Sequence, residues 1–326
     1  MFTLKRKNKA HIVMEIKDYI LRVIVVKGND SSQWVKHEVA LPKHTIDSAM
    51  IIDEMALFEF LREQFKAWGI KKMPISFFVP DTSVLLRTFT YPEEIQASDL
   101  KGYVEMELGH SIHLPFANPL IDVYNASPED QEAVIFAAPS EEVMKLIGIL
   151  QDVHVTPKVA DVRALSTIRF LTHTNKIDET KTYLIADWSI NELSIAIYSA
   201  GKVEFLRYQT IETDLAQWKK ADTDDGVSFT YGDELQDYRM VVTDQVLEID
   251  RMMNFFKFSL HKGEKEVNEI IVLGDNPILE DIGEFLATNL TTPLTVMTTD
   301  SVAKDFPQFG HRDVTLLGLA LKGVQA

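Results

Sequence analysis

Two stretches of the chain share one pattern of apolar and polar positions. In residues 14–28 an acid, Glu15, is followed by a mixed turn and then by an alternating apolar strand. Residues 186–201 repeat this layout, with Asp187 as the acid and the apolar positions of the next strand at the same offsets. Because alternation with period two is typical of strands, the two copies predict a duplicated meander and two related half-molecules. Each meander gains a third strand after a glycine-containing turn, at residues 34–41 and 202–209.

Each meander is followed by a predicted amphipathic helix, with its apolar residues in one stripe, and by a further strand. Apolar residues recur at helical spacing up to Gly69 in the first half and up to Gly263 in the second, which predicts a helix ending near each glycine. An apolar strand comes next, at residues 75–79 and 269–273. This order predicts mixed sheets covered by helices, an α/β class. We interpret the stripes as core: Leu57, Phe58, Leu61, Phe65 and Trp68 in the first helix, and Val246, Ile249, Met253, Phe256 and Leu260 in the second.

The segment between the halves has its own order of elements. Residues 84–92 predict a strand closed by proline, and a helix follows from Ser98. The remaining elements are two strands, a second helix and a closing strand, at residues 120–124, 133–139, 140–150 and 155–162. We therefore expect a compact inserted β-α-β-β-α-β unit.

Composition narrows the classes of function. The chain has 326 residues, 46% of them hydrophobic, which is enough for about two domains with a large core. Its formal net charge of -16 disfavours nucleic acid and anionic lipid as partners, and the exception is a short basic run of Lys5, Arg6, Lys7 and Lys9. Cysteine is absent, which excludes disulfides and thiol nucleophiles. No apolar run is long enough to span a bilayer, so we expect a soluble cytoplasmic protein.

Metal and hydrolase motifs are weak. His110 and His113 have no third ligand at suitable spacing, so we expect no metal site. The acidic residues 221–237 lack the ligand spacing of a calcium loop, and no G-x-S-x-G motif occurs. We therefore assign no catalytic residue.

Several longer motifs occur in a fixed order. VLLRTFTYP, YVEMELGHSIHLPF, AVIFAAPSEEVMKLIGIL and KVADVRALSTIRFL are followed by EVNEIIVLGDNPILEDIGEFLATNLTTPLTVM and DVTLLGLALKG. In order and spacing they resemble the type IV pilus assembly PilM family, actin-like proteins related to the cell-division protein FtsA. The IHLPF form of the second motif is similar to the Gram-positive branch of that family.

The resemblance implies an actin-like fold of the FtsA/PilM type with defined subdomains. Residues 1–80 would form the first subdomain, completed by a C-terminal helix at 313–326. Residues 81–160 would form the inserted subdomain. Residues 161–312 would form the second half, with a smaller subdomain around 210–265.

In actin-like ATPases two hairpins each carry an acid followed by glycine at the phosphates, and a glycine turn admits the adenosine. The resemblance assigns these turns to three places in this chain. The residues there are Glu15 and Lys17 in the first hairpin, Asp187 and Ser189 in the second, and Gly274 and Asp275 at the third turn.

These turns depart from the nucleotide-binding pattern. Lys17 and Ser189 stand where glycine would let the backbone approach phosphate, and Asp275 adds a repelling carboxylate. We therefore expect no bound cofactor and a degenerate ATPase. ATP with Mg²⁺ is the alternative, because Lys17 can contact phosphate and Glu15 and Asp187 can hold the metal through water.

The resemblance also implies a partner. A PilM-like protein would act as a cytoplasmic scaffold in a type IV pilus, competence or type II secretion-like machine. It would hold the short cytoplasmic N-terminal tail of a PilN-like membrane protein in a groove between the first and inserted subdomains. Recruitment to the inner face of the membrane would then occur through that partner, without direct membrane insertion.

Three residues match the family's strand arginine and helix acid. Arg87 lies on the first inserted strand, and Glu105 and Glu107 lie on the helix that follows. We assign them to the partner groove; the alternative is a surface ion pair between Arg87 and one of the two acids.

Two other functions stay open. An active ATP-binding or ATP-hydrolysing actin-like protein of the same machine would carry glycine at the phosphate turns. An FtsA-like cell-division protein would need a basic amphipathic helix at its C-terminus, and the sequence ends in LKGVQA directly after the last predicted helix, so we expect no such anchor.

Overall fold

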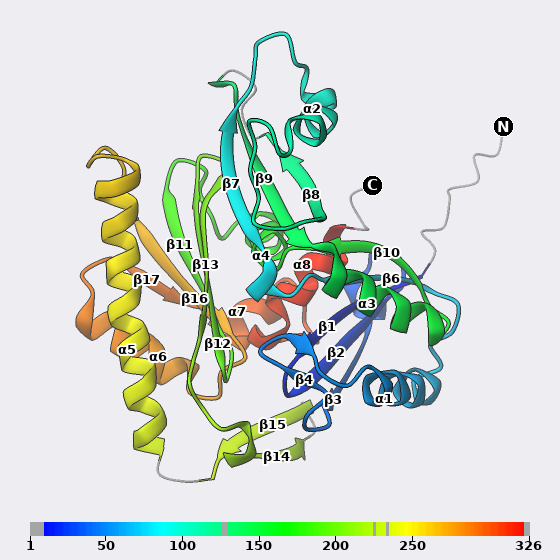
Figure 1. Ribbon diagram of the computed structural model, residues 1–326. Coiled ribbons are helices and arrows are strands. Elements are labelled where there is room, and N and C mark those ends of the chain that lie inside the picture. The colour runs from blue at the N-terminus through cyan, green and yellow to red at the C-terminus, as the bar shows by residue number, and fades with distance from the viewer. Residues whose placement is uncertain (1–9, 126–129, 224–225, 233–234, 323–326) are drawn as a thin grey trace, which may run out of the picture.

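Two five-stranded sheets face each other across a pair of helices, and a small third sheet stands above their junction (Figure 1). This computed structural model describes residues 10–125, 130–223, 226–232 and 235–322.

The first sheet begins with a tight hairpin. β1 (His11–Lys17) and β2 (Ile20–Val26) pair antiparallel along their whole length, and β3 (Val35–Ala40) continues the meander beside β2. β6 (Pro74–Phe78) and β10 (Thr156–Asp161) add in parallel on the other side of β1, giving the order β10-β6-β1-β2-β3. Both faces of β1 and β2 are covered, which explains why they read as nearly continuous apolar runs.

The second sheet repeats this topology. β11 (Thr182–Trp188), β12 (Glu192–Ser199) and β13 (Lys202–Thr210) form an antiparallel meander. β16 (Glu269–Gly274) and β17 (Leu294–Val296) add in parallel beside β11. The predicted α/β class with two related mixed-sheet halves is confirmed.

Helices cover the outer face of each sheet. α1 (Glu54–Ala67) and α3 (Ser140–Asp152) pack on the first sheet, and α5 (Leu235–Asn254) and α6 (Leu279–Asn289) pack on the second. Between the sheets lie α4 (Arg163–His173) and α8 (Val314–Lys322), whose apolar residues share one core with the inner faces of both (Figure 1). Residues 323–326 of the predicted C-terminal helix lie outside the described part of the chain.

The period of two along the strands decides where the candidate acids lie. Val13 contributes to the core between the sheets, whereas Ile12 and Met14 face the outer helices. Glu15 therefore falls on the inner face of β1. In the second sheet Ile185 faces inward, so Asp187 also lies on the inner face.

The inserted sheet is smaller than predicted. It contains β7 (Leu85–Thr90), β9 (Glu132–Pro139) and β8 (Pro119–Tyr124) in that order, with α2 (Leu100–Glu107) against it. The expectation that residues 140–162 close this unit is wrong. β10 pairs with β6 in the first sheet, and α3 packs against α1, because their apolar residues complete the core of the first half.

The apolar face of the second predicted helix is not buried along its whole length. Val246, Ile249 and Phe256 are buried as expected, but Leu260 is 44% exposed. Residues Phe255–Leu260 form a π-helical segment, and its wider turn rotates the last positions away from the stripe.

The remaining elements are short. Two hairpins are formed by β4 (Ile46–Asp47) with β5 (Met50–Ile51) and by β14 (Trp218–Thr223) with β15 (Gly226–Tyr231). One short α-helix, α7, spans Thr299–Ala303. The 3-10 turns are Ser31–Gln33, Asp81–Ser83, Ala97–Asp99, Leu215–Gln217 and His311–Asp313.

The helices α4 and α8 pack closely against each other at Gly318. A Cβ at Gly318 would lie 1.9 Å from the Ser166 carbonyl oxygen. We expect Gly318→Ala to lower the free energy of unfolding by about 3 kcal/mol, measured by urea denaturation. Gly148→Ala on α3 is the control, because that position opens onto free space and alanine is the better helix former by about 1 kcal/mol. Equal behaviour of the two variants would contradict the close packing of α4 on α8.

Candidate functional site

The turns of the two meanders meet at the junction between the sheets. Lys17 ends β1, and its ammonium donates to Ser189 Oγ at 2.6 Å and lies 2.8 Å from Asp275 Oδ1. The neighbouring Asp18 carboxylate accepts from the side-chain amide of Asn191 at 2.7 Å. All five side chains belong to buried residues. These contacts join the first hairpin to the second and to the turn after β16.

Donors from the first half converge on Asp275. Arg22 lies 2.7 Å from its Oδ2, and the Tyr19 hydroxyl donates to its Oδ1 at 2.8 Å. Burial alone would raise the pKa of Asp275, but Lys17 and Arg22 outweigh it and hold the pKa well below its ordinary value. Burial would likewise lower the pKa of Lys17, but Asp275 and Glu15 raise it. The pair is therefore ionised in the interior, where removing one partner typically costs about 3–5 kcal/mol.

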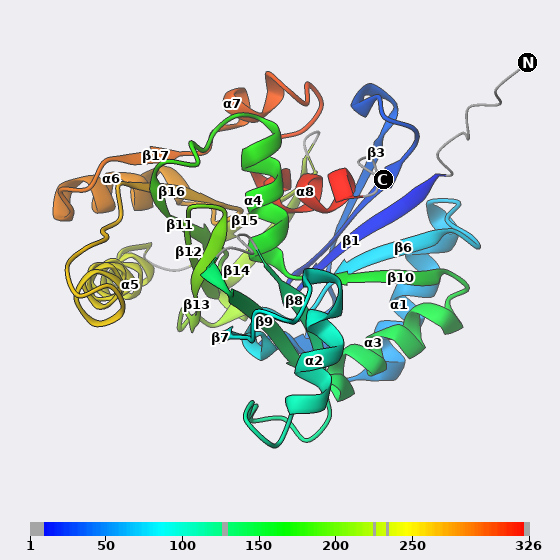
Figure 2. The ribbon, with the colours of Figure 1, turned by 90° about the horizontal axis from the view of Figure 1, so that it is seen from above.

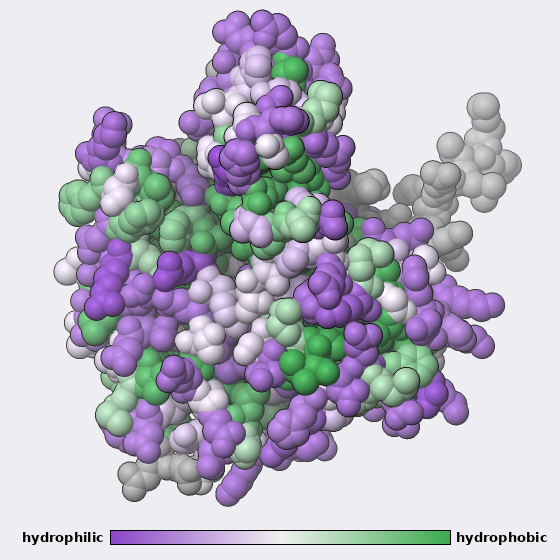
Figure 3. Space-filling model, in the orientation of Figure 1, coloured by the Kyte–Doolittle hydropathy of each residue, from purple (hydrophilic) through white to green (hydrophobic). Residues whose placement is uncertain are grey.

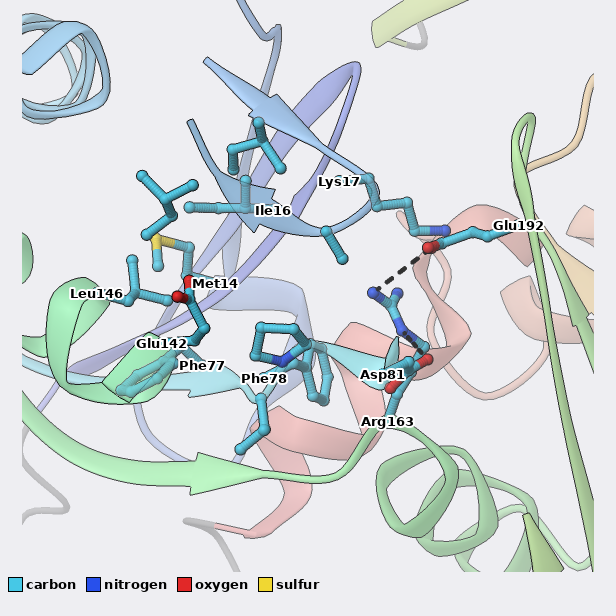
Figure 4. A pocket seen from close by; sticks show the side chains of 15 residues that line it. Met14, Ile16, Lys17, Phe77, Phe78, Asp81, Glu142, Leu146, Arg163 and Glu192 are labelled. Carbon is cyan, nitrogen blue, oxygen red and sulfur yellow. Dashed lines mark ion pairs between the residues drawn. The ribbon is translucent and has the colours of Figure 1, made fainter. Parts of the chain in front are cut away.

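Arg163 forms a second centre of charge. This residue begins α4, and its guanidinium lies 3.0 Å from Asp81 and 3.9 Å from Glu192 (Figure 4). It also pairs with Glu15, which in turn lies 3.2 Å from Arg22. Burial would raise the pKa of Glu15, but the surrounding cations lower it below its ordinary value. The two arginines and Lys17 therefore form one continuous network with the acids.

Two carboxyls of this network, those of Asp187 and Glu192, have fewer neutralising partners than the others. Asp187 Oδ2 accepts from the Thr315 hydroxyl at 3.1 Å, and its other oxygen has no hydrogen-bond partner among the described residues. Glu192 has Arg163 only at 3.9 Å. Burial raises the pKa of Asp187, and it raises the pKa of Glu192 to about 7.

The third turn is closed around the backbone of β11. Gly274 has a φ of +121°, and a Cβ there would lie 2.1 Å from the Trp188 carbonyl oxygen, so only glycine fits. Asn276 donates from its side-chain amide to the Ser189 carbonyl and to the Tyr238 hydroxyl, at 2.7 and 2.6 Å. A set of aromatic rings packs beside it with centroids 4.8 to 5.8 Å apart: Tyr19, Trp218, Phe229, Tyr231 and Tyr238.

Little space remains around these turns. One cavity of about 40 Å³ is lined by Lys17, Arg163 and Glu192 together with apolar residues of the first half (Figure 4). A second, of about 50 Å³, is lined by Asp187 and Thr167 among others. Pockets for small molecules usually measure about 300–1,000 Å³. Both of these cavities are therefore smaller than a usual small-molecule pocket.

The residues predicted from sequence separate into two sets. The six assigned to the phosphate turns, Glu15, Lys17, Asp187, Ser189, Gly274 and Asp275, come together at the junction described above. The three assigned to a partner groove lie elsewhere, on the inserted sheet and α2.

Arg87 does not pair with the helix acids. Its guanidinium donates to the His113 carbonyl, and no ion pair in the described part of the chain includes it. The alternative of a surface ion pair with Glu105 or Glu107 is therefore wrong, because the guanidinium turns toward the loop after α2. Glu107 accepts from the Ser111 hydroxyl at 2.5 Å, and Glu105 is exposed.

Sequence reasoning missed the arginines that neutralise the junction. Arg22 interrupts the otherwise apolar run ILRVIVV, and Arg163 follows directly after a predicted strand. A charge inside a fully apolar strand is a signal for a buried partner. The partner itself, Asp275, lies too far along the sequence for that signal to identify.

A larger groove lies between the inserted sheet and the helices beneath it. Its volume is about 820 Å³. β8 and β9 line one side, the end of β10 and α4 line the other, and the β12–β13 turn closes one end. Figure 2 shows α4 beside the inserted sheet. The apolar lining residues include Val123, Phe136, Leu165, Ile168 and Tyr198.

The inserted sheet is tied to the second half at the end of this groove. The Tyr124 hydroxyl donates to the Gly201 carbonyl at 3.0 Å. Lys202 pairs with Asp130 and lies 3.6 Å from Glu132. The inserted sheet therefore contacts both halves of the molecule, and Figure 3 shows hydrophobic residues gathered at its base, below a hydrophilic top.

A sequence profile described as type IV pilus assembly protein PilM matches residues 21–312. The chain belongs to this family. It is thus an actin-like pilus assembly protein of the PilM type, and the resemblance predicted from its motifs is confirmed.

Solved structures are similar in fold to this PilM-family protein. A PilM-PilN type IV pilus biogenesis complex matches with a TM-score of 0.75 and 18% identity, over 97% of this chain and 99% of that chain. The ethanolamine utilization protein EutJ from Carboxydothermus hydrogenoformans matches with a TM-score of 0.51 and 9% identity, over 96% and 89%. No curated protein matches the sequence. The actin-like fold predicted from the sequence is confirmed.

The described residues of this PilM-family protein hold no cluster of three or more histidine, cysteine, aspartate or glutamate side chains suited to a metal. His110 and His113 lie in the loop after α2. Within the same ranges no helix is both long and apolar enough to cross a membrane.

Glu192 makes the free energy of unfolding of this PilM-family protein depend on pH. A carboxyl with a raised pKa holds its proton more tightly when folded, so its stabilising effect is full below about 4.5 and is lost as the pH rises through about 7. Between pH 5 and 8 the wild type should therefore lose about 2–3 kcal/mol of unfolding free energy relative to Glu192→Gln. Urea unfolding at each pH measures this difference. Glu63→Gln on the exposed face of α1 is the control; a wild-type profile parallel to that of Glu192→Gln would contradict the assignment.

Proposed function

We propose that this PilM-family protein is a scaffold of a type IV pilus, competence or type II secretion-like assembly machine. In this function it holds the short cytoplasmic N-terminal tail of a PilN-like membrane protein. The observation that carries the proposal is the family match over residues 21–312, together with a structural match to a PilM-PilN complex. A partner of this kind would recruit the protein to the inner face of the membrane.

The groove beneath the inserted sheet is the proposed site for the tail. Its volume of about 820 Å³ suits a short peptide segment, and apolar side chains such as Leu165 and Phe136 offer anchor positions. β8 is an edge strand of the inserted sheet and β10 is an edge strand of the first sheet, so both have backbone groups free to pair with an extended peptide. A contact of Arg87, Glu105 or Glu107 with the partner stays a prediction, since none of them lines this groove.

We also propose that the phosphate turns serve structure rather than nucleotide binding. Lys17 and Arg22 neutralise Asp275 from within the protein, and Arg163 neutralises Glu15. These fixed cations supply the positive charge that a bound Mg²⁺ would otherwise supply beside the acids. The cavities of about 40 and 50 Å³ beside them support the same reading.

Nucleotide should therefore stabilise the protein little. Ligand at a hundred times its dissociation constant would add about 2.7 kcal/mol to the unfolding free energy. We expect no clear rise in melting temperature at millimolar Mg·ATP, measured by differential scanning fluorimetry. A clear rise that Asp187→Ala abolishes would contradict a closed site and favour the ATP-binding alternative.

The tail itself should bind through its apolar residues. A synthetic peptide copying the cytoplasmic tail of the cognate membrane protein should bind with micromolar affinity, about -8 kcal/mol, in isothermal titration. Leu165→Arg should weaken it at least about tenfold, because it removes an anchor from the groove. The matched control is Leu247→Arg on the exposed face of α5, which should leave affinity unchanged.

Two results would contradict the tail-holding function. One is equal binding of a scrambled peptide. The other is no binding of either peptide while the full-length partners still associate. Circular dichroism melts of both arginine variants check that each is folded.

A further inference from the structure

One end of the first sheet carries an unusual set of charges. The strands β1, β6 and β10 run parallel and side by side (Figure 2), so their starting ends form one edge of the sheet. The end of β2 lies there too, because Val26 pairs with His11. Three connecting segments border this edge, at residues 27–34, 68–73 and 153–155.

These segments contain three lysines and one carboxylate. The lysines are Lys27, Lys71 and Lys72, and all three are exposed. The carboxylate is Asp30, which is engaged as a cap for the Ser32 amide at 3.0 Å. The exposed Lys158 adds a fourth cation on β10. We call these four lysines the basic edge.

The lysines of the basic edge are not neutralised within the protein. No ion pair of the described chain includes any of the four. Lys72 also has a φ of 54°, a region that favours glycine, while its amide donates to the His154 carbonyl at 2.9 Å.

The basic edge contrasts with the rest of the molecule. The whole chain has a formal charge of -16, whereas the segments of the basic edge hold three lysines against one carboxylate, with the exposed Asp152 directly before residue 153. In the sequence, Lys5, Arg6, Lys7 and Lys9 directly precede β1, whose first residue lies at this same edge.

We propose that the basic edge binds the anionic surface of a lipid bilayer. Lysine ammonium groups near a negatively charged leaflet attract it without inserting into it. A lipid surface suits this edge better than nucleic acid does, because no aromatic ring stands free there for base stacking. Trp34 is buried, and Trp68 stacks on His37 with ring centroids 4.8 Å apart.

The position of the basic edge relative to the groove fits this assignment. β10 begins at the basic edge, beside Lys72, and its last residues line the proposed tail groove. Six residues of strand span about 20 Å. A tail segment that spans this distance can enter the groove while the basic edge lies at the lipid headgroups. The relation between the tail and the basic edge rests on the proposed function. The inference drawn from the charges of the four lysines does not depend on it.

Vesicle sedimentation of the full chain, without tail peptide, tests the proposal. The protein should bind vesicles of phosphatidylcholine with about one third phosphatidylglycerol at about 0.1 M salt, and should not bind pure phosphatidylcholine. Lys71→Glu with Lys72→Glu should lower the partition constant at least about 100-fold, since each charge near the surface contributes about fivefold. The matched control is Lys219→Glu with Lys220→Glu on β14, another exposed adjacent pair without an ion pair, which should change little.

Three outcomes would overturn the proposal. The first is no preference for anionic vesicles. The second is loss of binding when Lys5, Arg6, Lys7 and Lys9 are replaced by serine, combined with no effect of the Lys71 and Lys72 changes. The third is binding of a DNA duplex that the Lys71 and Lys72 changes abolish while vesicles do not bind. Tail binding is measured in solution without lipid, so failure of this proposal and failure of the proposed function remain distinguishable.

Discussion

The arrangement of the molecule depends on how a buried carboxylate, Asp275, is neutralised. Its charge is taken up by Lys17 and Arg22, which come from the other sheet. Removing either side of this contact would leave a charge unpaired in the closed interior, and an unpaired buried charge costs several kcal/mol. The contacts between the hairpins and the small size of the cavities beside them are consistent with this closure.

The same constraint bears on the proposal that the phosphate turns serve structure rather than nucleotide binding. Buried acids of both halves, Glu15, Asp187 and Asp275, lie at the junction, and when ionised they need positive charge beside them. Arg163 and Arg22 supply that charge as fixed parts of the chain. Glu15 and Asp275 are thus neutralised within the chain, while Asp187 keeps one oxygen without a hydrogen-bond partner among the described residues.

Much of the architecture was accessible from the sequence because strand and helix periodicity are local. The two meanders, the long helices and the strands after them were all predicted near their observed positions. The assignment of β10 to the inserted unit failed, because alternation in Val155 to Val162 says that a strand exists but not which sheet edge it joins. The end of the second stripe failed at the π-helical turn, where the periodicity itself changes. The phosphate turns could be located through the family motifs. The role of the arginines could not, because a pair such as Arg163 with Glu15 joins residues more than a hundred positions apart in the sequence.

The helix α8 has a consequence for how the chain is made. Its residues Leu316 and Leu317 share one core with Val13 and Ile24, from the first strands to be synthesised. The inner faces of those strands are therefore completed by residues about 300 positions further along the chain. Contacts of such long sequence separation form slowly, and exposed strands are prone to misassociation in the meantime. Folding of the first sheet is accordingly coupled to residues that are synthesised much later in the chain.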